Sequence, residues 1–203
     1  MKKYAVLHEP GDIVTLAGTR FVVLDVERRG SLPDSLFLLA LESVGASEFG
    51  SSNNYAESDL KKAVDKWLED MGKRGLDNAK LIPREIDLTT LDGSGCYGKL
   101  SVKAAPLTLD EAREYADIIP NAERWCWLAT GWSGPSKSDG DLALYVNSNG
   151  HWRRSSCSSS YGIRPALKIP SDLLLDSADK PDLSEVPTDT LLEEIRRRVV
   201  DKA

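Results

Sequence analysis

The chain has 203 residues, and its 26 Lys and Arg against 32 Asp and Glu give a formal net charge of −6. This length suits one globular domain with a hydrophobic core. Because the chain is acidic and has no run of basic residues, it offers no general attraction to a phosphate backbone, and nucleic-acid binding is not expected. No apolar run approaches the roughly 18 residues of a membrane span, so a membrane-spanning helix is not expected.

Cysteine usage and the N-terminal sequence both bear on the compartment. The three cysteines, Cys96, Cys126 and Cys157, are odd in number and form no CxxC pair. This pattern is neither a disulfide framework nor a zinc site. The first residues, MKKYAVLHEPGD, lack a signal-peptide core. We therefore expect synthesis in a reducing cytoplasm, which still allows release by lysis in an assembled particle.

The first half of the chain predicts three strands and a helix. Two strand-like segments, residues 13–17 and 20–26, are split by a glycine and predict a β-hairpin. Residues 35–42 (SLFLLALE) are apolar enough to form a strand buried on both faces. Residues 56–70 have apolar side chains at helical spacing and acidic residues in the first turn, which predicts an amphipathic helix.

Further elements are predicted in the second half. Thr108 and Glu111 have the spacing of a capping box, which opens a short helix to about Ile118. Residues 142–146 (LALYV) and the closing YGIRPALKI, residues 161–169, are typical of strands.

Three segments define the predicted domain organisation. Residues 1–170 form the domain, residues 171–187 a Pro- and Asp-rich linker, and residues 188–203 an amphipathic helix. A helix of this length is marginal alone, so it should pack on something. It could pack on its own domain, or it could dock to a neighbouring subunit or a larger assembly.

The most unusual stretch, residues 125–167, holds four of the five tryptophans. It contains two polar clusters, residues 138–141 and 151–160. Trp125 and Trp127 alternate along a strand-like segment and are interpreted as core. Because binding residues tend to lie on loops held by a rigid scaffold, the polar clusters predict a display surface.

Several motifs recur together in a known group of proteins. They are the hairpin opened by PGD, the helix SDLKKAVDKWL, the segment APLTLDEAREYA, the WLAT and GWS motifs, and the closing YGIRPALKI. Over roughly residues 10–169, the chain resembles bacterial and phage proteins with a C-type-lectin-like fold, related in architecture to the formylglycine-generating-enzyme type. The resemblance implies an α+β fold of small mixed sheets with two helices, followed here by the C-terminal helical appendage.

Within that group, the chain resembles the variable proteins of diversity-generating retroelements, which are often found in phages and prophages. In these systems template adenines are mutated on copying, so that an AAC codon can become Ser, Asp, Gly, His, Arg or Tyr. The two polar clusters consist mainly of these residue types. Trp152 and Cys157, whose codons contain no adenine, would stay fixed as anchors.

We therefore predict a ligand- or receptor-binding display protein with a hypervariable face, and not an enzyme. The expected partner is a bacterial surface protein or glycan, and the expected setting is a phage or prophage structural component at the virion or cell surface. The C-terminal helix would allow a homo-oligomer or a larger virion assembly. The predicted ligand-binding residues are Trp132, Ser138, Asp139, Gly140, Asp141, Tyr145, His151, Trp152, Arg153, Arg154, Ser155, Ser156, Ser158, Ser159, Ser160 and Tyr161.

Two alternatives stay open: a formylglycine-generating-type enzyme, and a non-variable structural or assembly protein. Cys157 lies in the region of that enzyme type's cysteines, but the partner cysteine is missing, so the activity is not carried over. His151 and the distant His8 form no recognisable catalytic arrangement. No metal site and no cofactor are predicted. Arg164, in an apolar strand, is expected to be buried and paired as part of the scaffold.

Overall fold

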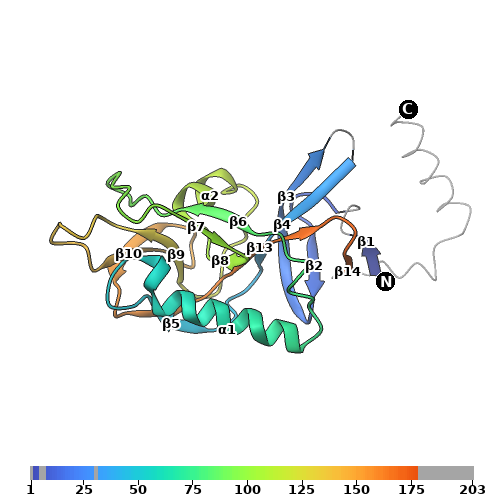
Figure 1. Ribbon diagram of the computed structural model, residues 1–203, viewed down its shortest axis with the longest axis horizontal. Coiled ribbons are helices and arrows are strands. Elements are labelled where there is room, and N and C mark those ends of the chain that lie inside the picture. Colours follow the sequence, from blue (N-terminus) through green and yellow to red (C-terminus); the bar gives the residue numbers. More distant parts are fainter. Residues whose placement is uncertain (1, 5–7, 30–31, 178–203) are drawn as a thin grey trace, which may run out of the picture.

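A computed structural model describes residues 2–4, 8–29 and 32–177 of the chain. Within these ranges the protein is α+β and consists mostly of strands (Figure 1). The strands form a seven-stranded sheet, a five-stranded sheet and a two-stranded ribbon of β6 (Arg84–Asp87) and β7 (Lys99–Val102). The predicted α+β class is confirmed.

The seven-stranded sheet is antiparallel throughout. In spatial order its strands are β1 (Lys2–Tyr4), β14 (Leu174–Ser177), β2 (Ile13–Leu16), β3 (Thr19–Arg29), β4 (Leu32–Ala40), β13 (Ala166–Pro170) and β8 (Ala104–Ala105). The predicted hairpin is β2 and β3. Its two-residue turn places Ala17 and Gly18 at φ 47° and 76°, and positive φ at both positions is the geometry that matches strand twist.

Strand β4 lies at the centre of the core. Leu36, Leu38 and Ala40 belong to one cluster of buried side chains, and Phe37 and Leu39 belong to a second. Since successive strand residues point to opposite faces, β4 supplies both clusters at once. This confirms the prediction that the segment is buried on both faces.

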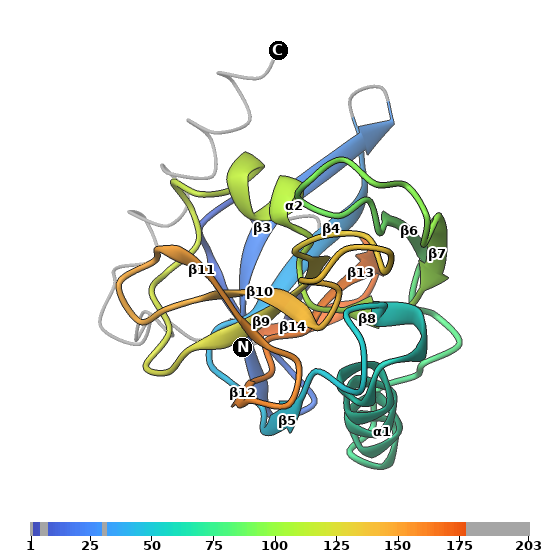
Figure 2. The ribbon, with the colours of Figure 1, turned by 90° about the vertical axis from the view of Figure 1, so that its left-hand side faces the viewer.

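The five-stranded sheet lies at the end of the molecule away from β1 and β14, and Figure 2 views it from that side. Its strands, in spatial order, are β11 (Trp152–Ser156), β10 (Leu142–Val146), β9 (Cys126–Gly131), β12 (Ser160–Gly162) and β5 (Ala46–Glu48). The β12–β9 pair is parallel and the other pairs are antiparallel, so the sheet is mixed.

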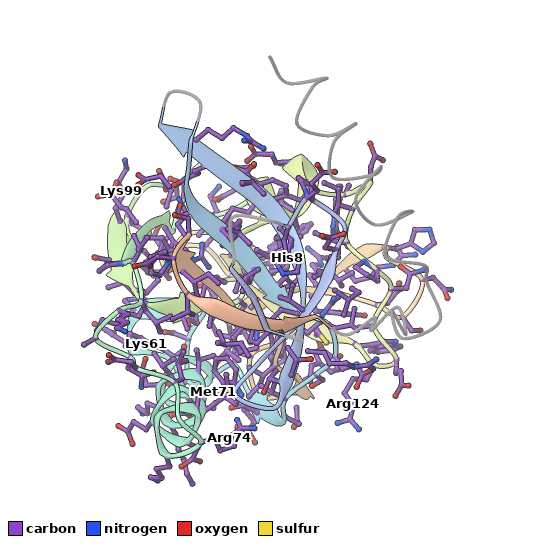
Figure 3. All side chains as sticks on the ribbon, turned by 90° about the vertical axis from the view of Figure 1, so that its right-hand side faces the viewer. His8, Lys61, Met71, Arg74, Lys99 and Arg124 are labelled. Carbon is purple, nitrogen blue, oxygen red and sulfur yellow. The ribbon has the colours of Figure 1, made fainter. Side chains whose placement is uncertain are left out.

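The longer helix, α1 (Asp59–Lys73), covers one side of the sheets (Figure 1). It was predicted from residue 56, but Tyr55–Glu57 form a separate 3-10 turn, η2, and the Ser58 side chain caps α1 by accepting from the backbone of the third helical residue. The buried Met71 lies close to Arg74 at the C-terminal end of α1, where an Arg74 nitrogen is 2.9 Å from the Met71 sulfur (Figure 3).

The shorter helix, α2 (Leu109–Glu114), begins at the predicted capping box. Thr108 Oγ1 accepts from the Glu111 backbone N–H, and Glu111 accepts from the Thr108 backbone N–H. The helix is shorter than the predicted end at Ile118, because Tyr115 already has non-helical angles of φ −103° and ψ 18°.

The C-terminal part of the predicted organisation is corrected at its start. Residues 174–177, expected to lie in a linker, form β14, which pairs with both β1 and β2. Backbone pairing with two strands thus places these four residues in the sheet, although the wider stretch is rich in Pro and Asp and indicated a linker. The rest of the linker and the helix at residues 188–203 lie outside the described residues. In the described ranges, no helix has both the length and the hydropathy needed to cross a membrane.

Candidate functional site

Half of the second polar cluster, residues 152–156, lies on β11, at the edge of the five-stranded sheet. This strand pairs with β10, in a register that sets Arg153 opposite Tyr145 and Arg154 opposite Leu144. Among the described strands, none pairs with its other side. Trp152, Arg153 and Arg154 are exposed. The strand thus presents a row of polar and aromatic side chains on a regular backbone rather than on a loop.

Alternation along β11 divides these side chains between two faces of the sheet. Trp152 and Arg154 lie on one face, where the Arg154 guanidinium carbon is 4.3 Å from the centre of the Trp132 ring. Arg153 and Ser155 lie on the other, where Ser155 Oγ accepts from the Tyr161 hydroxyl at 2.9 Å. The side chains of the predicted hypervariable face that lie on β11 are therefore divided between two faces of the sheet. Of the predicted residues, those from Trp152 to Ser156 share this edge strand, and their side chains point to both faces of the sheet.

The first side, called here the Trp152 face, consists of Trp132, Trp152 and Arg154 with two neighbours. The ring of Trp152 is 41% exposed and lies 5.5 Å from the guanidinium carbon of Arg113 on α2. Arg154 also approaches an Asp139 carboxylate oxygen at 3.7 Å. Arginine against an aromatic ring is attractive, so these contacts hold the side chains in place while leaving them accessible.

The second side, called here the Trp125 face, consists of Trp125, Tyr145, Arg153, Ser155 and Tyr161. Trp125 is 45% exposed and stacks on Tyr145, with ring centres 5.3 Å apart and planes 19° from parallel. The ring of Tyr161 lies 4.6 Å from that of Tyr145. Tyr145 is buried, and its burial raises its pKa. Tyr145, one of the predicted ligand-binding residues, lies against the exposed Trp125 ring.

Trp125 is a residue that sequence reasoning assigned to the core. Its alternation with Trp127 was correct, since both contact Tyr145 and Tyr161. Trp127 is buried, lies against Phe49, and donates from its indole nitrogen to the Ser47 carbonyl at 2.9 Å. Trp125 precedes β9 and has no comparable cover. The same face of one strand can therefore be core at one position and surface two residues earlier.

The serine-rich segment is an ordered turn between β11 and β12. Ser155 and Ser159 hydroxyl oxygens are 3.0 Å apart, and those of Ser156 and Ser158 are 2.9 Å apart. The Cys157 side chain points inward and is only 2% exposed. Local hydrogen bonding and this buried anchor explain why the composition does not produce a flexible linker.

The first polar cluster, residues 138–141, lies in the loop before β10. Ser138 and Asp141 are exposed, whereas Asp139 and Gly140 are half-buried. The loop adjoins the serine turn, because the Cys157 backbone N–H donates to the Asp141 carbonyl at 2.7 Å. The structure thus brings the two predicted clusters together at one end of the molecule.

Cys126 and Cys157 are buried, whereas Cys96 is exposed. Burial raises the pKa of Cys157 to about 12 and that of Cys126 to about 11, so both thiols are protonated at neutral pH. His151 is exposed, whereas His8 is buried and bonds to Asp12 at 3.2 Å. Figure 3 labels His8 from the side opposite to that of Figure 2. In the part of the chain that the structure describes, no group of three or more His, Cys, Asp or Glu could hold a metal ion.

Comparisons with protein-family models, with curated proteins and with solved structures find no match to this chain. The functional interpretation therefore depends on surface geometry. Within the described residues, the exposed large hydrophobic side chains are Leu91, Trp125 and Trp152. Trp152 lies on the edge strand β11, and Trp125 lies on the opposite face of the sheet against Tyr145 of β10, which makes this end of the sheet the most distinctive part of the described surface.

Proposed function

We propose that the chain is a binding module that presents β11 and its adjoining turns to a ligand. The observation that carries the proposal is the exposure of two tryptophans on opposite faces of the five-stranded sheet: Trp152 on the edge strand β11, and Trp125, which stacks on Tyr145 of the neighbouring β10. Exposed tryptophans accompanied by arginines are enriched among residues that dominate binding energy. Trp125 is stacked on Tyr145 and Trp152 is held near Arg113, so each ring loses little conformational freedom on binding.

The chemistry of the surface suits a bacterial surface protein or glycan. Flat aromatic rings offer apolar contact area, Arg153 and Arg154 offer charged donors, and the serine hydroxyls offer adaptable hydrogen bonds. An edge strand also has free backbone N–H and C=O groups that a ligand can engage. A partner that covered both faces would have to wrap around β11.

The proposed setting is a phage or prophage structural component of C-type-lectin-like fold with a hypervariable face. The mixed five-stranded sheet and the two helices are compatible with that fold. Exposed positions on β11 and its turns can change residue type at little cost to stability, whereas Cys157, expected to stay fixed, is buried. Sequencing the neighbouring DNA tests this setting. A reverse transcriptase beside a near-copy of the segment for residues 132–167, differing at adenines, is the expected result.

The binding proposal is tested with alanine variants of each face. Labelled protein is incubated with a panel of intact bacterial cells and with immobilised bacterial surface glycans, and bound protein is quantified. Trp125→Ala with Arg153→Ala, and separately Trp152→Ala with Arg154→Ala, should each weaken binding by about tenfold or more. Lys99→Ala, on the exposed ribbon strand β7, is the matched control and should bind as the parent does. Undiminished binding by both folded double variants would refute the proposal.

A further inference from the structure

Strand β11 pairs with a described strand on one side only, so half of its backbone groups face away from the sheet. Two backbone hydrogen bonds fix which half. Beyond one end of the β10–β11 pair, the Asn147 N–H donates to the His151 carbonyl at 2.9 Å. Beyond the other end, the Cys157 N–H donates to the Asp141 carbonyl at 2.7 Å. Since bonded and non-bonded pairs alternate along an antiparallel ladder, the odd-numbered residues of β11 bond to β10 and the even-numbered residues face outward.

The outward-facing residues of β11 are therefore Trp152, Arg154 and Ser156. No described residue bonds to the backbone N–H or C=O of Trp152 or Arg154, whereas the Ser156 carbonyl accepts from the Ser159 N–H at 2.9 Å. The register between β10 and β11 runs without a shift, and the segment WRRSS contains neither proline nor glycine. Because Trp152 and Arg154 are also exposed, this edge is regular and open to a further strand.

The edge carries positive charge on both faces of the sheet. Arg153, on the Trp125 face, forms no ion pair with a described residue, and Arg154, on the Trp152 face, reaches an Asp139 carboxylate oxygen at 3.7 Å. Successive residues of a neighbouring strand also point to opposite faces. Two adjacent acidic residues on such a strand would place one carboxylate beside each arginine, and opposite charges on neighbouring strands stabilise their pairing.

The same charges disfavour a second copy of the chain as the neighbour. When two copies of β11 pair antiparallel about a two-fold axis, the register with the greatest overlap has its axis at Arg154 and sets the two Arg154 side chains opposite each other. A shift of the axis by one residue toward Trp152 sets the two Arg153 side chains opposite each other. Like charges directly opposite each other destabilise a sheet. The charge of this edge therefore favours a different, acidic chain.

We propose that the partner of β11 is an extended, acidic polypeptide segment that adds to the five-stranded sheet as a new edge strand. This inference rests on the function proposed above and names the chemistry of the partner. The segment would bond to the outward N–H and C=O groups of Trp152 and Arg154, with acidic side chains near Arg153 and Arg154. Strand addition takes affinity from backbone bonds and specificity from alternate side chains. Because the bonds are made by the backbone, they persist when side chains on β11 change.

Hydrogen exchange in the full chain, followed by NMR, checks the free edge itself. The amides of Trp152 and Arg154 should exchange at least about tenfold faster than those of Arg153 and Ser155, because only the latter bond to β10. Equal rates for the two sets would mean that the outward groups already have partners and would overturn the proposal.

The partner is tested with a short acetylated and amidated peptide in which threonine and valine flank two adjacent glutamates. It is titrated into the full chain while the backbone amide signals of β11 are followed by NMR. The amides of Trp152 and Arg154 should shift saturably, with a dissociation constant of about 1 mM or tighter. Replacing the glutamates with lysines should weaken binding by about tenfold. No saturable shift at up to about 5 mM of the acidic peptide would overturn the proposal.

Backbone N-methylation of the peptide separates strand pairing from side-chain contact, because it removes donors and leaves every side chain in place. Two peptides are methylated at alternate residues, one on each of the two sets. Methylation of the set that faces β11 should weaken binding by about tenfold or more, whereas methylation of the other set should leave the affinity within about threefold. Equal effects of the two methylated peptides would reject the new strand.

Two variants at one position isolate the backbone donor of β11. Arg154→Pro removes the outward N–H together with the charge, whereas Arg154→Val removes the charge alone. Proline is tolerated on an edge strand where the N–H faces solvent. Peptide binding should be about fivefold or more weaker in Arg154→Pro than in Arg154→Val, and Lys99→Ala should bind as the parent does. Equal affinities of the two Arg154 variants would reject the new strand. If Arg154→Pro does not fold, the methylated peptides still decide the outcome.

Cell binding separates this inference from the function on which it rests. Equal cell binding by Arg154→Pro and Arg154→Val, with loss in the tryptophan double variants, would keep the binding surface and reject the new strand. Alternating effects of the methylated peptides, with undiminished cell binding by both double variants, would support the strand site and refute the proposed function.

Two other partners are outcomes of the same experiments. Binding to immobilised glycans that is equal in Arg154→Pro and Arg154→Val would identify a glycan held by side chains and overturn the polypeptide proposal. A concentration-dependent dimer in analytical ultracentrifugation that is lost in Arg154→Pro would identify a second copy as the partner and overturn it too.

Discussion

Strands β4 and β11 follow the same two-residue alternation and end in opposite environments. β4 pairs with β3 and β13, and residues 36–40 are buried on both faces. β11 pairs with β10 alone, and its first three residues are exposed. The comparison shows that an apolar strand is positioned by burial of its own side chains. A polar strand is positioned by the buried residues of adjoining segments. Here those residues are the buried Leu144 and Cys157.

The sharpest test of this difference is Leu38→Ala in β4. Leu38 is completely buried in the larger core cluster, so its truncation removes apolar contact and leaves a cavity. The free energy of unfolding should fall by about 2–5 kcal/mol. Urea denaturation monitored by tryptophan fluorescence measures it. A loss below about 1 kcal/mol would show that β4 is less tightly packed than its burial indicates.

The same contrast between interior and edge applies to ion pairs. Arg84, whose side chain is only 4% exposed, forms an ion pair with Glu111, while the Lys99–Glu85 pair is exposed on both sides. Glu111→Gln weakens the partner of a buried guanidinium and should lower the free energy of unfolding by about 2 kcal/mol. Glu85→Gln is the matched control, with an expected change of at most about 1 kcal/mol. Similar losses for both variants would remove the distinction.

A smaller effect on the free energy of unfolding is expected from ionisation of Cys157, the buried thiol that anchors the end of β11. Unfolded thiols titrate near pH 8.5, whereas burial raises the pKa of Cys157 to about 12. The folded state therefore keeps a proton that the unfolded state loses. The free energy of unfolding should be constant below about pH 8.5 with respect to this group, and should decline as pH rises toward 12.

Urea denaturation between neutral and alkaline pH checks this decline. It should be shallower in Cys157→Ala, because the titrating group is absent. The exposed Cys96 supplies the control, and Cys96→Ala should keep the parent's slope. Labelling with a thiol reagent adds a second readout. In the native protein Cys96 should react rapidly, whereas Cys126 and Cys157 should react only on unfolding. Rapid labelling of Cys157 would mean that the end of β11 opens readily.

The smallest effect on stability is expected at the exposed edge itself. Arg153→Ala removes an exposed side chain that forms no ion pair with any described residue. The free energy of unfolding should stay within about 0.5 kcal/mol of the parent's. The same substitution, combined with Trp125→Ala, forms one of the double variants expected to weaken ligand binding. A large loss of stability would mean that β11 contributes to the fold and would blur its difference from β4.

Much of the fold could be predicted where local signals are strong. The hairpin of β2 and β3 (its turn lies at Ala17 and Gly18, one residue earlier than predicted), the apolar run of β4 and the capping box at Thr108 each depend on neighbours in sequence. β14 could not be predicted in the same way. Its short apolar run, with Leu174 and Leu175, is set in a Pro- and Asp-rich stretch, and its place in the sheet depends on pairing with the distant β1 and β2.

The candidate site shows the same limit. Sequence pattern located the polar clusters and their tryptophans, and the structure brings both clusters to one end of the molecule. Pattern could not tell that Trp125 is exposed while Trp127 is buried, because their alternation is identical and only the packing of Phe49 over one of them differs. Nor could it reveal the unpartnered nitrogen of Arg164, whose carbonyl partners come from Ala40 and Pro120.

The sequence by itself determined the α+β class, the central hairpin and helices, and the segment in which unusual surface chemistry is concentrated. Those features follow from short-range periodicity and from side chains that bond to their own backbone. Tertiary structure alone decided which side of β11 each residue faces, which tryptophan meets solvent, and which backbone groups of β11 are left unpaired. Burial and partnership depend on segments far apart in the chain, and no local pattern encodes them.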